Sequence, residues 1–115
     1  MKEIPAPDEH RGLLYDARMR RFEDLIGRQL AIFREDYAEL LSACSAAERA
    51  YDRSGADEAE ERYAAFLELV EEGSDALGEI RDTYASTLEP DQAEAYERAF
   101  DEEVARRLPP FGLGL

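Results

Sequence analysis

Two residues in this sequence, Cys44 and His10, have side chains that commonly act as nucleophiles or metal ligands. His10 is the only histidine. Acids lie near it but no second nitrogen or sulfur ligand does, so we interpret it as a solvated residue. Cys44 has no second cysteine to pair with and falls within a stripe of apolar residues. We therefore expect its thiol to be buried and unreactive.

The carboxylates are numerous, but their spacing does not match a catalytic or metal site. A di-iron site in a helical bundle needs glutamates and a Glu-x-x-His pair that project into the core, and the apolar stripes described below carry neither. Four acids, Glu61, Glu68, Asp75 and Asp82, recur every seventh residue on one helix face. We interpret this ridge as a solvated face, with a weak cation site or a surface for a basic partner as the alternative.

The sequence also has no Gly-rich phosphate loop and no nucleophile elbow. It therefore predicts no catalytic residue, no cofactor and no metal, and a non-enzymatic protein.

Composition and charge narrow the class of protein and of partner. A chain of 115 residues has room for one domain with one modest core. The formal net charge of −14 at pH 7 disfavours nucleic acid and anionic membranes, since both would repel the chain, but it leaves basic partners open. No apolar run could span a bilayer, and no basic start precedes an apolar stretch. We expect a cytoplasmic protein that binds neither nucleic acid nor membrane.

Start and stop signals divide the single domain, residues 1–115, into three helices and a tail. The first helix should cover about residues 8–54, because between Gly12 and the Ser-Gly stop only Gly27, a tolerable glycine, interrupts it. A capping-box spacing then predicts a second helix over about 57–88. Proline at a first helical position predicts a third helix over about 90–107. Residues 108–115 form an apolar tail in which two prolines follow Leu108.

Apolar residues in the first two helices repeat with heptad spacing, and each repeat contains one irregular step at a matching distance from Gly55. If the chain reverses at Gly55, partners across the seam lie at equal distances on either side of it. The pairs are Tyr51–Ala59, Ala47–Tyr63, Cys44–Phe66, Leu40–Val70, Tyr37–Gly73, Phe33–Leu77, Leu30–Ile80, Ile26–Tyr84 and Phe22–Leu88. Large residues face small ones, as a packed core requires, with room at Gly73 for the Tyr37 ring. This predicts a long antiparallel hairpin resembling a coiled coil, with a kink at Gly73 as the alternative.

The uneven charge of the chain suggests where the third helix lies. Residues 56–115 carry most of the net negative charge, whereas acids and bases nearly balance in residues 1–55. Arginines such as Arg21 and Arg28 are natural neighbours for the acids of the third helix, so we expect it along the N-terminal half of the first. Single surface ion pairs are weak, so the apolar stripe of the third helix must hold it there.

A third helix of that length leaves the turn end of the hairpin, roughly residues 36–72, as a bare two-helix arm. Leu41 and Leu67 lie on one side of its seam and Leu69 on the other, so two helices alone would leave apolar surface exposed. A homodimer with a four-helix core there is the simplest remedy. Burial of a different protein is the alternative.

The tail residues Phe111, Leu113 and Leu115 alternate with glycines, which is typical of an extended peptide that docks in a groove. Docking on the protein's own bundle or its dimer mate is the simpler expectation, and recognition by another protein is the alternative. These features favour an interaction or scaffold protein that acts as a helical dimer, with these three residues and the three leucines of the arm as its interface. Two other hypotheses are an acidic inhibitor of a basic surface and a small enzyme with its site at the dimer interface.

Overall fold

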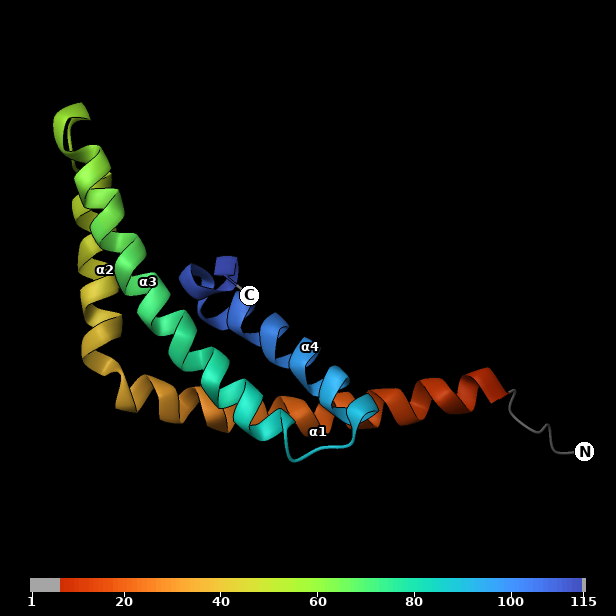
Figure 1. The fold of residues 1–115 in the computed structure, drawn as a ribbon. Helices are drawn as coiled ribbons and strands as arrows, with labels where there is room; N and C mark the ends of the chain where they lie inside the picture. Colours follow the sequence, from red (N-terminus) through yellow and green to blue (C-terminus); the bar gives the residue numbers. More distant parts are fainter. Residues whose placement is uncertain (1–6, 115) are drawn as a thin grey trace, which may run out of the picture.

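The computed structural model describes the backbone of residues 7–114 and the side-chain environments of residues 22–112. Within that range the chain is all-helical, as predicted. Its elements are α1 (Pro7–Asp36), α2 (Ala38–Asp52), α3 (Ala56–Ala85), α4 (Pro90–Arg107) and the short 3-10 helix η1 (Pro109–Gly114). In Figure 1, α2 and the first half of α3 form an arm, and α1, the second half of α3 and α4 form a body.

The predicted first helix over residues 8–54 is two helices, α1 and α2, which meet at a sharp elbow at Tyr37 (Figure 1). Tyr37 has φ −114° and ψ 30°, outside the helical range. The backbone hydrogen bonds continue around it, since its N–H donates to the Phe33 carbonyl at 2.8 Å and its carbonyl accepts from the Leu41 N–H at 3.0 Å. Neither proline nor glycine lies at the bend, so its cause is packing: α4 and η1 lie against α3, and α1 turns away from α3 to cover α4.

The arm is an antiparallel pair formed by α2 and the first half of α3. Near its tip the rings of Tyr51 and Tyr63 lie with centroids 5.3 Å apart. In the turn, Ser54 Oγ donates to the Tyr51 carbonyl at 2.7 Å. Cys44 of α2 and Val70 of α3 are buried. Side-by-side pairing of the first and second predicted helices is thus limited to this part of the molecule.

The Cys44 thiol should react slowly in the folded protein. Its pKa is raised by burial and, to a lesser degree, by the carboxylates of Glu48 and Glu72. Burial and a raised pKa both lower the amount of accessible thiolate, which is the reactive form. We expect iodoacetamide to alkylate Cys44 about tenfold or more slowly in the native protein than in urea, as followed by mass spectrometry. Equal rates in the two states would show that the arm opens freely.

The ends of α3 and α4 lie close to the predicted positions. α3 begins directly after Gly55 and ends slightly earlier than expected. At that end the hydroxyls of Ser86 and Thr87 donate to the carbonyls three residues back, both at 2.7 Å. These bonds satisfy backbone carbonyls that would be left without a partner where the helix ends. α4 has the predicted bounds, because Pro90 suits its first turn and Pro109 cannot continue it.

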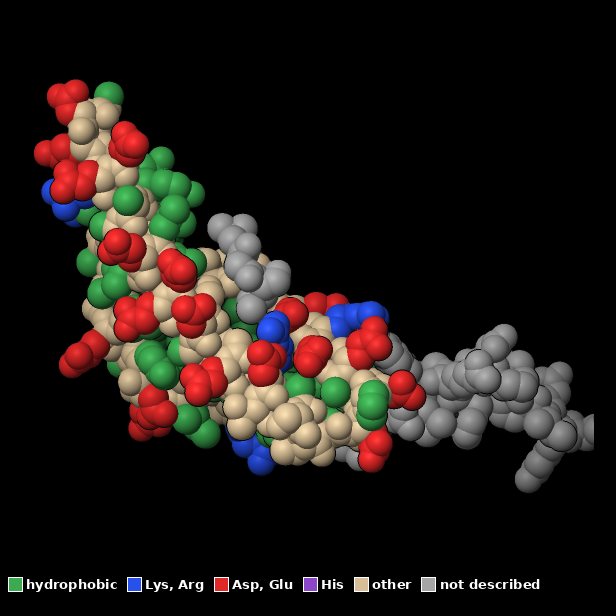
Figure 2. Space-filling view, in the orientation of Figure 1, with side chains coloured by type: hydrophobic (Ala, Val, Ile, Leu, Met, Phe, Trp, Pro, Cys, Tyr) green, Lys and Arg blue, Asp and Glu red, His purple; other side chains and the backbone are tan. Residues whose placement is uncertain are grey.

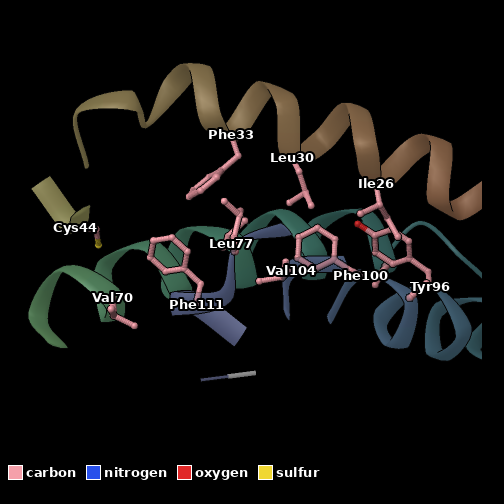
Figure 3. Packing of buried hydrophobic residues seen from close by; sticks show 13 residues of the cluster. Ile26, Leu30, Phe33, Cys44, Val70, Leu77, Tyr96, Phe100, Val104 and Phe111 are labelled. Carbon is pink, nitrogen blue, oxygen red and sulfur yellow. The ribbon is translucent and has the colours of Figure 1, made fainter. Parts of the chain in front are cut away.

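The core lies in the body, where α4 packs against both α1 and α3. Figure 3 shows side chains from α1, α3, α4 and η1 that point into one cluster. The largest fully buried side chains are Ile26, Leu30, Phe33, Leu77, Tyr96, Phe100, Val104 and Phe111. α4 therefore lies along α1 as predicted, but it also packs against α3 and fills the angle between the two.

Polar contacts also tie α4 to its neighbours. Arg81 of α3 donates to Asp101 at 2.9 Å, and Arg34 of α1 donates to the Arg107 carbonyl at 3.0 Å. Glu103 is 6% exposed and pairs with both arginines that end α4, at 2.6 and 2.7 Å. A buried carboxylate needs such partners, so we interpret Glu103 as a structural residue.

Tyr96 should make the stability of the fold sensitive to high pH. It is fully buried, and its hydroxyl donates to Gln29 Oε1 at 2.9 Å. Burial raises the pKa of Tyr96 to about 12, against about 10 in an unfolded chain. The stability that follows from this difference is complete below about pH 10 and is lost as the pH rises to about 12. Urea unfolding at a series of pH values should show the free energy of unfolding falling between about pH 10 and 12, and falling less in Tyr96→Phe. An equal fall in both proteins would show that Tyr96 is not its source.

The C-terminal tail begins as a 3-10 helix, not as the extended peptide predicted. η1 turns back over α3 and α4 and buries Phe111, which is 1% exposed. The Phe111 ring lies so close to Gly73 that a Cβ there would be 2.8 Å from both Cδ1 and Cζ. It also meets the Phe33 ring edge-on, with centroids 6.2 Å apart. Phe111 thus occupies the position opposite Gly73 that the heptad pattern assigns to Tyr37.

Candidate functional site

An open groove runs between α1 and α3, and no α4 residue lines it. Its volume is about 640 Å³, and we call it the apolar groove. The lining residues are Gln29, Ile32, Phe33, Asp36, Tyr37, Ala76, Glu79, Ile80, Thr83, Tyr84 and Thr87. The groove follows from the elbow, because α1 leaves α3 there and α4 with η1 fills the angle from one side only.

The helical register explains which side chains line the apolar groove. Phe33 faces the core and is 1% exposed, whereas Ile32, one residue earlier and about 100° around the helix, is 58% exposed. The floor is continuous with the core: the rings of Tyr84 and Tyr96 have centroids 4.8 Å apart, and Phe33 stacks on Tyr37 at 4.8 Å. The floor is therefore held in place from beneath, with Ile32 at its rim.

Two polar side chains of the apolar groove are already engaged in hydrogen bonds. Gln29 already accepts the hydrogen bond from Tyr96, and the Thr87 hydroxyl donates to the Tyr84 carbonyl at 2.7 Å. Asp36 and Glu79 are exposed carboxylates. Such a lining suits apolar side chains in the floor and cationic groups at the rim.

A second groove continues the first past the elbow. It has a volume of about 600 Å³ and is lined by Glu35, Asp36, Tyr37, Ala38, Glu39, Leu40, Ala43, Leu69 and Glu72. We call it the acidic groove, since four of these nine residues are carboxylates. Asp36 and Tyr37 line both grooves, so the two grooves form one surface along α3. From Leu69 to Thr87 that surface spans about 27 Å at 1.5 Å per residue.

Figure 2 shows how charge is distributed over one face of the molecule. Acidic side chains are spread along the arm and around the elbow, with hydrophobic side chains visible between them and few basic ones.

The predicted interface residues lie in different places. Leu69 lines the acidic groove. Leu41 is half-buried and packs against the core cluster, whereas Leu67 is 43% exposed and lines neither groove. Phe111 is buried in the protein's own core, which agrees with the expected docking of the tail on the protein's own bundle and leaves this side chain no exposed surface for a partner. Leu113 and Leu115 lie outside the residues whose side chains the structure describes.

The sequence reasoning missed Ile32 and the apolar groove. One signal was present, since Ile32 is a large apolar residue beside the stripe residue Phe33, just as Leu41 is beside Leu40. In a straight hairpin, however, the seam would close between the first two helices and leave no groove there. Finding the groove requires the elbow.

The other candidates from the sequence gain no further support. The acids of the ridge, Glu61, Glu68, Asp75 and Asp82, are exposed. Within the described part of the chain, no three His, Cys, Asp or Glu residues are grouped so that they could hold a metal ion. His10 falls outside the residues with described side chains. Among the described helices, none is both long and apolar enough to cross a membrane.

Comparison with known proteins assigns no family: no protein-family model, no curated protein and no solved structure matches this chain. The functional assignment therefore rests on the geometry of the two grooves.

Proposed function

We propose that this protein is a non-enzymatic interaction module whose apolar groove binds an amphipathic helix of a partner protein. The observation that carries this proposal is the groove of about 640 Å³ with Ile32 58% exposed at its rim. Helix-in-groove recognition uses apolar partner residues at positions i, i+3, i+4 and i+7. Phe33, Ile80 and Tyr84 provide a floor for such residues.

A partner helix in this position would complete a four-helix arrangement. α4 covers one side of the angle between α1 and α3, and the partner would cover the other. Complete burial of an isoleucine or leucine contributes about 1.5–3 kcal/mol relative to exposure. Micromolar affinity corresponds to about 8 kcal/mol, so the partner must bury several side chains along the groove as well as Ile32.

A second copy of the chain is the second candidate occupant, and it would make the protein a helical homodimer. Ile32 projects beside the groove on the same face, so a two-fold pairing could bring each Ile32 to the groove of the other copy. The pairing would also bring together the carboxylates of Asp36 and Glu79 from the two copies, and this like-charge repulsion opposes it. We therefore favour a different protein as the occupant.

Designed helical peptides test the proposal. A fluorescent, alanine-rich peptide of about 18 residues with leucines at i, i+3, i+4 and i+7 should bind the wild-type protein. Ile32→Glu should weaken binding about tenfold or more, because a carboxylate would have to be desolvated in place of the apolar contact. Fluorescence anisotropy measures the affinity, and circular dichroism checks the fold of the variant.

Leu67→Glu is the matched control, since it puts the same charge at an exposed apolar residue outside both grooves. It should bind the peptide like the wild type. Failure of the wild type to bind any such peptide would overturn the proposal, and equal loss in both variants would place the site elsewhere. Sedimentation velocity tests the second candidate: a wild-type dimer that only Ile32→Glu converts to a monomer would put a second copy in the groove.

A further inference from the structure

The acidic groove combines carboxylates with apolar side chains. Glu35, Asp36, Glu39 and Glu72 line it together with Leu40, Ala43 and Leu69. Neither arginine nor lysine is among the described residues that line either groove. Carboxylates gathered around one groove repel one another, so a bound cation would be stabilised there.

Two arginines of the neighbouring helices are already engaged elsewhere. Arg34, near the end of α1, donates to the Arg107 carbonyl at 3.0 Å. Arg81, in the second half of α3, contacts Asp101 and Asp82, each at 2.9 Å. Both arginines contact groups that line neither groove. The carboxylates of the acidic groove are therefore not neutralised by these two side chains.

The apolar residues decide what kind of cation fits. Arginine and lysine lay their aliphatic stems along apolar surface and keep the charged head in water. Leu40, Ala43 and Leu69 offer that surface between the carboxylates. Tyr37, 37% exposed at the junction of the two grooves, adds an aromatic face on which a guanidinium can stack. A small inorganic cation would leave the apolar surface unused.

We infer that the partner's helix is bipartite. One half carries apolar residues that enter the apolar groove, and the other carries arginines or lysines on the same face, which lie over the acidic groove. This inference rests on the proposed helix-binding function and adds the chemistry of the partner. The continuous surface of about 27 Å matches a helix of about 18 residues, so a single helix can contact both grooves.

Two peptides and two protein variants test the inference. The first peptide carries leucines at i, i+3, i+4 and i+7 in one half and arginines on the same face of the other half. The second replaces each arginine with glutamine. Both are made in the two chain directions, because the grooves do not fix the direction. Anisotropy titrations at several salt concentrations give the affinities and their salt dependence.

The triple substitution Glu35→Gln, Glu39→Gln, Glu72→Gln neutralises three of the four carboxylates of the acidic groove and leaves Asp36, which both grooves share. The matched control neutralises three exposed acids near the arm tip instead, with Asp57→Asn, Glu60→Gln, Glu61→Gln. The control changes the net charge by the same amount, so it separates recognition at the groove from long-range attraction by the acidic chain.

In the better chain direction, the arginine peptide should bind wild-type protein about tenfold more tightly than the glutamine peptide at low salt. The groove variant should abolish this advantage and flatten the salt dependence, and the control variant should keep both. If the two peptides bind equally, or if the control loses as much as the groove variant, the inference is wrong while the helix-binding function stands. If neither peptide binds in either direction, both are wrong.

Discussion

Replacing Phe111 with alanine should lower the free energy of unfolding by about 3–5 kcal/mol, the range found for buried phenylalanines. Phe111 is 1% exposed and is wedged between Gly73 of α3 and Phe33 of α1. Its removal leaves a cavity where α1, α3 and η1 meet. Of the tail residues whose side chains the structure describes, only Leu108 would then remain buried in the core. Urea unfolding followed by circular dichroism measures the change.

Tyr63→Ala is a suitable control for Phe111→Ala, because it removes an aromatic ring that is 46% exposed and lies beside the Tyr51 ring near the arm tip. We expect it to cost about 1 kcal/mol. If Phe111→Ala cost no more than Tyr63→Ala, the tail would not be docked in the body in solution, and the place opposite Gly73 would be free.

Gly73→Ala should have the second large effect on stability. Its sign shows whether helix propensity or contact with the Phe111 ring dominates at this position. Helix propensity favours alanine over glycine by about 1 kcal/mol inside a helix. A Cβ at position 73, however, would be 2.8 Å from two atoms of the Phe111 ring and closer still to Cε1. Overpacking of this kind costs about 1–3 kcal/mol. We therefore expect net destabilisation, with a lower midpoint of urea unfolding.

Gly78→Ala is the matched control for this prediction, since it lies in the same helix and its Cβ would meet nothing within 4 Å. It should stabilise the protein by about 0.5–1 kcal/mol. In a Phe111→Ala background, Gly73→Ala should lose its penalty, because the two positions are in direct contact and their effects are not additive. Stabilisation by Gly73→Ala in the wild-type background would contradict the observed packing of the tail.

The same contacts link the tail to the proposed binding site. Phe111 packs on Phe33, Phe33 stacks on Tyr37, and both Phe33 and Tyr37 line the apolar groove. We expect Phe111→Ala to weaken binding of the leucine peptide even under conditions in which the variant remains folded. An unchanged affinity would mean that the groove keeps its shape without the tail.

The positions of most helix ends are determined by the sequence, because the signals are local. Pro90 at a first helical position and the pair Pro109–Pro110 bound α4, and a Ser-Gly stop marks the turn at Gly55, without reference to the rest of the chain. The apolar stripes also identify most of the core, including Ile26, Leu30 and Leu77. Local propensity and periodicity are enough for these features, since each is fixed by neighbours within a few residues.

Only the tertiary structure decides the elbow, the docked tail and the grooves. The heptad pattern offers Tyr37 as the partner of Gly73, but the space beside a glycine accepts any ring that reaches it, and Phe111 of the tail fills it instead. Which ring occupies this space depends on the total packing energy of α4 and η1 against α1 and α3. That energy is a sum over contacts between residues far apart in the chain. The bend at Tyr37 and the exposure of Ile32 follow from that competition, and no local pattern in the sequence contains it.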